Sequence, residues 1–343
     1  MQRKIIVFAE PRKVELRSTS TPAMDADSVR VRTTVTSISR GTELNLYHGR
    51  TREIRGVWYA TYPLVPGYEI VGRVQEVGAN VTHVQPGDRV VATITVGGYE
   101  GYCNAWGGQT EYAMCTVASE MGSEYIEPVK IPDNVSDEEA AMSILATVPL
   151  NGIEKKLSFV GPGMTVAVLG QGGMGISAGQ FHHRMGARVI VADEVPERAE
   201  IASRGGWAES VCGRSDELIE PIKELTDGGP DVVHDCSGSL ECLHAAVEMV
   251  KEGGTVLGTG LYLQPITFDL CPTLWTRCIT FACCVGASPV QRAKILKWIS
   301  EGTFDAKCMV GETFALEQAA EAYRRLDKEP HQIIKPIIRW WTP

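Results

Sequence analysis

A glycine-rich segment near the middle of the chain constrains its fold more than any other feature. The apolar run 165–169 leads directly into Gly170-Gln-Gly-Gly-Met-Gly175, and the next ten residues are predicted to form a helix. A second predicted strand, 188–192, is followed by Asp193. A strand, a glycine turn, a helix and an acid about 20 residues further on are the fingerprint of a dinucleotide-binding βαβ unit.

Each glycine of this loop has a predicted purpose. Gly170 allows the tight turn, Gly172 lets the backbone approach a pyrophosphate, and Gly175 lets the helix pack on the strand. Gly173 and Met174 belong to the same predicted cofactor loop, and the free N–H groups of the helical turn that follows it, with the positive end of the helix dipole, face the anion. The sequence therefore predicts a dinucleotide site, and a glycine turn without a ligand is the less favoured alternative.

The acid at the end of the second strand indicates which dinucleotide binds. Asp193 can accept hydrogen bonds from the hydroxyls of an adenosine ribose and would repel a 2′-phosphate. Glu194 adds a second negative charge beside it. Arg198 could in principle bind a phosphate, but we expect it to begin the next helix. The sequence thus favours NAD over NADP.

Composition restricts the class of protein and its partners. A chain of 343 residues can form two domains, and 44% hydrophobic with 22% charged residues is typical of a folded globular protein. The net charge of −9 offers no basic patch, so we expect neither nucleic acid nor a membrane as a partner. The ten scattered cysteines, the absence of a secretory signal and the absence of a membrane-spanning apolar stretch favour a cytoplasmic enzyme with reduced thiols.

Two kinds of pattern divide the chain. Residues 1–150 contain short alternating strands punctuated by glycine and proline, which predicts a small, partly open barrel. Strands alternate with helical segments over 151–290, which predicts a doubly wound parallel sheet. Residues 291–343 contain two predicted helices and a final strand. The expected fold class is α/β, with a β-rich domain beside a dinucleotide-binding domain.

Three further residues are predicted to lie near the cofactor. Ser237 ends one strand of the second half, and Thr259 and Gly260 end the next strand. Ligands of open α/β sheets bind at the carboxyl edge, so we expect Thr259 and Gly260 beside the nicotinamide. Cys283 and Cys284 lie in an apolar run and are predicted to be small buried strand residues, with a redox pair as the less favoured alternative.

Several strings along the chain resemble those of the medium-chain dehydrogenase/reductase family. They run in the family's order, and they are Gly41-Thr-Glu-Leu-Asn-Leu-Tyr-His-Gly49, Pro66-Gly-Tyr-Glu69, Pro86-Gly-Asp-Arg-Val90, Gly107-Gly108 before Glu111-Tyr112, and the loop 170–175. The resemblance implies a GroES-like catalytic domain over 1–150, completed by 291–343. It also implies an inserted Rossmann domain over 151–290, an active site in the cleft, and a homodimer. The strings 39–43 and 62–69 look most like a branch that includes bacteriochlorophyllide a dehydrogenase.

The residues expected to bind the family's catalytic zinc are missing. The family's zinc is held by a cysteine, a histidine and a further acid or cysteine, but Ser39 or Arg40 stands at the cysteine position and Tyr68 at the histidine position. Residues 146–150 supply no acid or thiol, and only Cys103 and Cys115 lie where four cysteines would hold a structural zinc. Hydroxyl and guanidinium groups are poor zinc ligands, so no metal is predicted.

Without zinc, another group must stabilise and protonate the developing alkoxide. Tyr68 is the leading candidate for proton donor and acceptor, although as a base it would need a lowered pKa, through Arg40 or the cofactor ring. Tyr68 as a packing residue that fills the vacated metal site is an equal alternative. Glu69 is more plausible as a structural acid than as a general base. Thr42 is predicted to pass a proton, to hold a substrate hydroxyl, or only to make a local turn bond. Ser39 and Arg40 complete the candidate catalytic group.

These features predict a zinc-independent, NAD-dependent oxidoreductase that interconverts a secondary alcohol and a ketone. The expected substrate is a small polar molecule, namely a polyol, a cyclitol or a sugar derivative, because the nucleotide half resembles that of polyol enzymes. One alternative is an NADPH-dependent reductase of quinones or enones. The other is a dinucleotide-binding protein without turnover.

Overall fold

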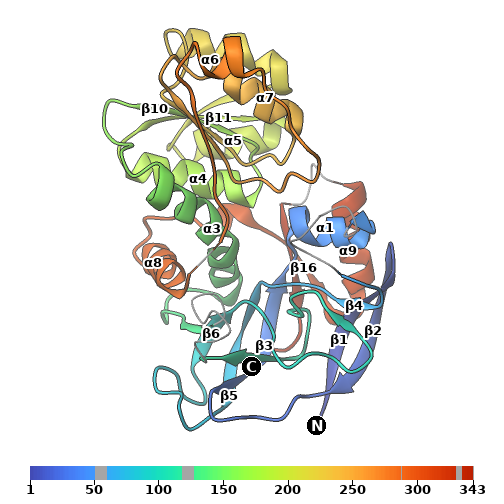
Figure 1. Ribbon diagram of the computed structural model, residues 1–343. Helices are drawn as coiled ribbons and strands as arrows, with labels where there is room; N and C mark the ends of the chain where they lie inside the picture. The colour runs from blue at the N-terminus through green and yellow to red at the C-terminus, as the bar shows by residue number, and fades with distance from the viewer. Residues whose placement is uncertain (51–59, 118–126, 287, 330–333, 343) are drawn as a thin grey trace. The chain divides into compact units, whose positions relative to one another are not determined.

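The computed structural model describes residues 1–50, 60–117, 127–286, 288–329 and 334–342 (Figure 1). The chain forms two compact units, Met1–Leu145 with Ala287–Pro343 (unit 1) and Ala146–Gly286 (unit 2). Within the described ranges, no helix has the length and apolar character needed to cross a membrane.

Unit 2 is built on a parallel sheet. Among the described residues its strand order is β12-β11-β10-β13-β14-β15, and all neighbouring strands are parallel. These strands are β10 (Thr165–Leu169), β11 (Arg188–Asp193), β12 (Glu209–Cys212), β13 (Val232–Asp235), β14 (Thr255–Gly258) and β15 (Thr280–Cys283). The order reverses between β10 and β13, which is the topological switch point of a doubly wound sheet. The predicted Rossmann-type fold is therefore confirmed.

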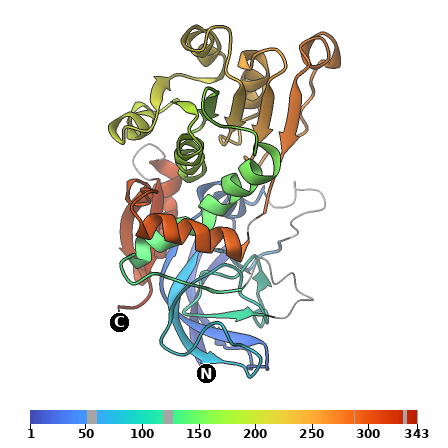
Figure 2. The ribbon, with the colours of Figure 1, turned by 90° about the vertical axis from the view of Figure 1, so that its left-hand side faces the viewer.

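Helices cover this sheet in two groups. They are α4 (Gly173–Arg184), α5 (Pro196–Arg204), α6 (Ile219–Leu225) and α7 (Leu240–Met249), with a π-turn at Leu270–Leu274. α4 and α5 contact each other and the strands β10 to β12, whereas α6 contacts α7, which packs on β13 and β14 (Figure 2). Because strand side chains alternate between faces, Leu169 and Val233 join the apolar core that contains Leu243 of α7, and His234 lies on the opposite face of β13.

β10 and β11 match their predicted bounds to within one residue, and α4 begins three residues before the predicted helix. A 3₁₀ turn at Ser215–Leu218 leads directly into α6. The expectation that Cys283 and Cys284 are buried was wrong. Cys283 is exposed and Cys284 is half-buried, because β15 is the edge strand of the described sheet, whereas Phe281 of the same strand packs against the core.

Unit 1 contains two sheets in its described part. The larger runs β16-β17-β3-β5-β6-β9, with β8 also paired to β3, and the smaller runs β2-β1-β4-β7. The larger sheet comprises β3 (Ser28–Ser37), β5 (Ile70–Val77), β6 (Arg89–Ala92), β8 (Tyr112–Thr116), β9 (Val129–Lys130), β16 (Val310–Ala315) and β17 (Lys335–Arg339). The smaller comprises β1 (Gln2–Glu10), β2 (Lys13–Ser20), β4 (Leu64–Val65) and β7 (Cys103–Asn104). Since β17 pairs antiparallel with β3, segments from both ends of the chain share one sheet.

Four helices accompany these sheets in the described residues. They are α1 (Arg40–Tyr47), α3 (Asp137–Lys156), α8 (Pro289–Ser300) and α9 (Ala319–Lys328), with 3₁₀ turns at Lys307–Met309 and Leu316–Gln318. Ser136 caps the start of α3, since its hydroxyl accepts the N–H of Glu139 at 3.2 Å and the Glu139 carboxylate accepts the N–H of Ser136 at 3.0 Å. α1 and α9 share an apolar core in which Phe8, Tyr47 and Tyr323 pack ring against ring. This core holds the end of α1 through Leu46 and Tyr47, while several candidate residues lie at the start of the helix.

Candidate functional site

The glycine loop of unit 2 accepts only glycine at two of its positions. Gly170 has a φ of 82°, and a Cβ there would lie 2.7 Å from the Cα of Ser237. A Cβ on Gly175 would overlap the carbonyl oxygen of Gly170. The turn between β10 and α4 therefore needs both glycines, as the sequence pattern predicts.

The start of α4 has the features of an anion site. Gly172 is the residue before the helix, no side chain caps the first turn, and a Cβ on Gly172 would meet no described atom within 4 Å. The N–H groups of Gly173 and Met174 lack partners within the helix because they belong to its first turn. Open space in front of such groups fits a pyrophosphate, and a larger residue than Gly172 would fill it.

Asp193 ties the loop to the end of β11. Its Oδ2 accepts the N–H of Gln171 at 2.6 Å, and its Oδ1 accepts the N–H of Val195 at 2.9 Å. Each carboxylate oxygen retains a second lone pair that fits a ribose hydroxyl. The neighbouring Glu194 pairs with Arg214 at 3.0 Å. Arg198 lies inside α5, as expected.

The other predicted cofactor residues lie at the same edge of the sheet. Ser237 follows β13 and donates its N–H to Asp235 Oδ1 at 3.1 Å. Thr259 follows β14, and its Oγ1 lies 3.0 Å from His234 Nε2. Gly260 packs so closely on Gly238 that a Cβ would lie 2.5 Å from the Gly238 nitrogen. The carboxyl ends of β10, β13 and β14 thus bring the candidates together.

A cluster of three hydroxyl groups forms the second candidate site, in unit 1. The Oη of Tyr68 lies 2.6 Å from Ser39 Oγ and 3.4 Å from Thr42 Oγ1. Ser39 precedes α1 and Thr42 lies in its first turn, so the start of one helix supplies both partners. Arg40, the first residue of α1, is half-buried beside them. We call Ser39, Thr42 and Tyr68 the hydroxyl cluster.

The surroundings of Tyr68 favour its neutral form. Burial raises the pKa of the phenol above its ordinary value, and the nearby Glu69 carboxylate raises it further, while hydrogen bonds from Ser39 and Thr42 oppose the shift. The lowered pKa that a base requires is therefore not found. A neutral phenol with two hydroxyl neighbours is suited to donate a proton.

Glu69 has the contacts of a structural acid. It is fully buried, its Oε1 lies 2.7 Å from the Nζ of Lys335, and its Oε2 accepts hydrogen bonds from Lys335 and from the hydroxyl of Ser37. Both oxygens are occupied by groups of the chain itself. Lys335 was not among the predicted residues, because nothing in the local sequence connects it with a position 266 residues earlier.

Glu43 is a second buried acid that the sequence analysis did not select. Its Oε1 accepts the N–H of Ser39 at 2.9 Å, and its Oε2 accepts hydrogen bonds from Tyr323 and, at 3.3 Å, from Gln109 Nε2. Burial raises the pKa of Glu43 to about 7. Because it accepts a hydrogen bond from the backbone N–H of Ser39, Glu43 fixes the position of one member of the hydroxyl cluster. An acid four residues after a helix-initiating serine was the local signal for it.

The residues at the expected zinc positions are chemically unlike zinc ligands. Ser39, Arg40 and Tyr68 present a hydroxyl, a guanidinium and a phenol, none of which is a usual zinc donor. Across the described ranges, no group of three His, Cys, Asp or Glu side chains is arranged to hold a metal. Cys103 and Cys115 lie on different strands, β7 and β8.

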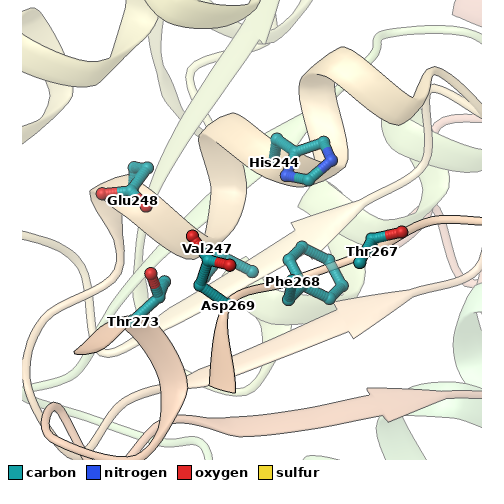
Figure 3. A pocket seen from close by; sticks show the side chains of 7 residues that line it. All are labelled: His244, Val247, Glu248, Thr267, Phe268, Asp269 and Thr273. Atoms are coloured by element: carbon teal, nitrogen blue, oxygen red, sulfur yellow. The ribbon is translucent and has the colours of Figure 1, made fainter. Parts of the chain in front are cut away.

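A pocket of about 250 Å³ opens elsewhere on unit 2, between α7 and the segment before the π-turn (Figure 3). Its lining residues are His244, Val247, Glu248, Thr267, Phe268, Asp269 and Thr273. None of the predicted site residues lines it. The ring of Phe268 contacts the ring of His244, with 5.0 Å between their centroids.

Comparisons with known proteins point to one family. Residues 25–134 match the alcohol dehydrogenase GroES-like domain, and residues 173–301 match the zinc-binding dehydrogenase domain. The chain is 26% identical to a D-xylulose reductase of Saccharomyces cerevisiae, over 98% of this chain and 97% of that protein. It is also 26% identical to a sorbitol dehydrogenase of Bacillus subtilis, over 98% and 96%. An alcohol dehydrogenase from Thermus sp. ATN1 has a similar structure, with a TM-score of 0.79, 25% identity and coverage of 98% and 99%.

Proposed function

Because this chain belongs to the medium-chain dehydrogenase/reductase family, we propose that it is an NAD-dependent oxidoreductase that works without zinc. It interconverts a secondary alcohol and a ketone on a small polar substrate, namely a polyol, a cyclitol or a sugar derivative. The observation that carries the proposal is the hydroxyl cluster. Two of its members, Ser39 and Tyr68, are at positions where the family resemblance would put zinc ligands.

The substrate class is supported by the relatives. The D-xylulose reductase and the sorbitol dehydrogenase both align with nearly the whole chain, so the similarity is not limited to the nucleotide-binding half. Sorbitol is a polyol and D-xylulose is a ketose, and such molecules carry secondary hydroxyl and ketone groups. Hydroxyl partners such as Ser39 and Thr42 are suited to bind substrates of this kind.

The residues of unit 2 fit a nicotinamide dinucleotide, which supplies or accepts the hydride when bound. The first-turn N–H groups at Gly173 and Met174 bind the pyrophosphate, and Gly172 leaves room for it. Asp193 accepts hydrogen bonds from the adenosine ribose, and its charge disfavours NADP. This discrimination is the reason for naming NAD as the cofactor.

The residues that transfer the proton belong to unit 1. During reduction the Tyr68 phenol donates its proton to the developing alkoxide, and its raised pKa keeps the phenol protonated until that alkoxide forms. The resulting phenolate regains a proton from water, and Ser39 and Thr42 are close enough to relay it, each giving one proton to its neighbour and taking up another. Glu69 takes no part in this transfer, because Lys335 and Ser37 occupy its carboxylate.

A screen with both cofactors tests the proposal against its alternatives. Purified protein is incubated with NAD or NADP and a panel of polyols, cyclitols and sugar alcohols, and with NADH or NADPH and ketones, quinones and enones, while absorbance of the reduced cofactor is followed. We expect turnover with NAD(H) on polar alcohols and ketones. Turnover restricted to NADPH with quinones or enones would contradict the proposal, as would dinucleotide binding without turnover of any class.

We also propose a cytoplasmic homodimer. The ten cysteines are all unpaired, which is compatible with a reducing compartment, and dimers are the expectation from the family resemblance. Light scattering of the purified protein tests the dimer, and a mass equal to one chain would contradict it.

A further inference from the structure

We propose that a buried pair of histidines, His182 and His234, positions the hydroxyl of Thr259 as a hydrogen-bond donor to the nicotinamide half of the cofactor. Both histidines are positioning residues in this account, and only Thr259 contacts the ligand. The inference rests on the proposed function, because it takes a nicotinamide dinucleotide as the ligand of the sheet edge in unit 2.

The three side chains form a continuous series from the interior to the edge of the sheet. His182 of α4 places Nε2 at 3.1 Å from Nδ1 of His234 on β13. His234 in turn places Nε2 at 3.0 Å from Oγ1 of Thr259, directly after β14. The two imidazole rings meet edge to face, with centroids 5.4 Å apart and an interplanar angle of 80°. Both histidines have no exposed surface.

The fold alone does not require polar groups at this place. The strands that flank His234 present Val168 and Leu257 at the same register, so an apolar residue would suit the position. Burying two imidazoles carries a desolvation cost that only their hydrogen bonds offset. That cost points to a use for the hydrogen bonds at the end of the series, where Thr259 lies at the carboxyl edge of the sheet.

The unpaired end of the series determines where the hydrogens lie. Burial lowers the pKa of His182 to about 3 and also lowers that of His234, so both rings are neutral and each carries one N–H. Nδ1 of His182 has no partner among the described atoms. A buried N–H without an acceptor is costly and rare, so the hydrogen of His182 lies on Nε2. His182 therefore donates to His234, and His234 donates from Nε2 to Thr259.

This direction leaves the hydrogen of Thr259 available. Since its Oγ1 accepts from His234, the hydroxyl must donate its own hydrogen elsewhere. The described acceptors near it, Asp235 O and Cys236 Sγ, are both 3.4 Å away. The distance to Asp235 O is long for a hydrogen bond from a hydroxyl to an oxygen, and the sulfur of Cys236 is a weak acceptor. An oxygen of the nicotinamide carboxamide or of the adjoining ribose is the class of acceptor that completes the series.

Four variants test this inference. Thr259→Val removes the donor with little change of volume, and His234→Phe removes the group that orients it. His234→Gln keeps an N–H near the position of Nε2 and serves as the conservative variant, while His182→Phe removes the hydrogen bond that fixes the hydrogen of His234. Dissociation constants for NADH and for ADP-ribose, which lacks the nicotinamide, are measured on each folded variant.

We expect Thr259→Val and His234→Phe each to weaken NADH binding about tenfold, the size of one hydrogen bond, and to leave ADP-ribose binding unchanged. The double variant should be no weaker than either single variant, and His234→Gln should recover most of the affinity. Unchanged NADH affinity in Thr259→Val would overturn the inference, even if His234→Phe does not fold. Equal losses for NADH and ADP-ribose in His234→Phe would also overturn it. Failure of the wild-type protein to bind either molecule would instead contradict the proposed function.

Discussion

At the scale of single residues, Tyr68 carries the chemistry of the account. Its phenol has two hydroxyl neighbours and a pKa above the ordinary value, so in the proposed mechanism it acts as a neutral acid. The sequence identified the three hydroxyl residues by their positions in family strings. It did not reveal the direction of the pKa shift, because that depends on burial and on the charge of Glu69.

Replacing Tyr68 with Phe should therefore lower kcat for ketone reduction by about 10²- to 10⁴-fold, the usual size of general acid catalysis. The dissociation constant for NADH should stay the same, because the residues proposed to bind the cofactor all belong to unit 2. Tyr62→Phe is the matched control: it also loses a phenol hydroxyl, but one that donates to the Leu46 carbonyl outside the hydroxyl cluster. Equal rates for Tyr68→Phe and the wild-type protein would make Tyr68 a packing residue.

The raised pKa of Glu43 predicts that the stability of the folded chain depends on pH. Its pKa is about 7 in the folded chain and near 4.5 when unfolded, so between these values the folded state holds a proton that the unfolded state releases. The contribution of Glu43 is therefore fully present below pH 4.5 and is lost as pH rises through 7. The loss amounts to about 3 kcal/mol if the full shift acts on folding.

Denaturant unfolding of the wild-type protein and of Glu43→Gln, measured from pH 5 to pH 8, tests this. The amide resembles the protonated acid, so the variant should gain stability relative to the wild-type protein as pH rises. A difference between the two proteins that is constant over this range would show that Glu43 keeps an ordinary pKa.

At the scale of elements, the turn from β10 into α4 was predictable because its determinants are local. The positive φ of Gly170 and the close packing of Gly175 follow from neighbours a few residues away, apart from the contact with Ser237. Tertiary context decided other features. The apolar run that contains Cys283 and Cys284 forms an edge strand of the described sheet, and sequence alternation cannot tell an edge strand from a central one.

Gly172→Val should separate folding from cofactor binding at this turn. A Cβ there meets no described atom within 4 Å, so the melting temperature should change little, while NADH affinity should fall at least tenfold because the side chain fills the proposed pyrophosphate space. Gly161→Ala, also in unit 2, is the control: its Cβ would have an ordinary contact at 3.9 Å, and NADH affinity should not change. Wild-type affinity in Gly172→Val would place the pyrophosphate elsewhere.

At the scale of the whole molecule, buried ion pairs and hydrogen bonds connect distant parts of the chain within unit 1. Lys335 meets Glu69 across 266 residues, and Tyr323 meets Glu43 across 280. No spacing rule applies to such separations, so the sequence could suggest a structural role for Glu69 without naming its partner. The division into a β-rich part and a nucleotide-binding part was predictable, because each has its own repeating pattern of strands and helices.

Lys335→Met should destabilise unit 1 by about 3–5 kcal/mol, because it leaves the Glu69 carboxylate buried without its partner. The double variant Lys335→Met with Glu69→Gln should recover part of that loss, since no uncompensated charge remains. Urea unfolding followed by tryptophan fluorescence measures both. Equal stability of the single and double variants would show that the ion pair contributes little.

The central claim is that hydride and proton transfer proceed without a metal, with Tyr68 in place of the zinc ligands. The most direct test is the turnover of wild-type protein with NADH and a polar ketone after chelation and removal of all metal, verified by elemental analysis. We predict the same kcat before and after chelation, and no increase when zinc is added. Loss of activity on chelation that added zinc restores would contradict the account.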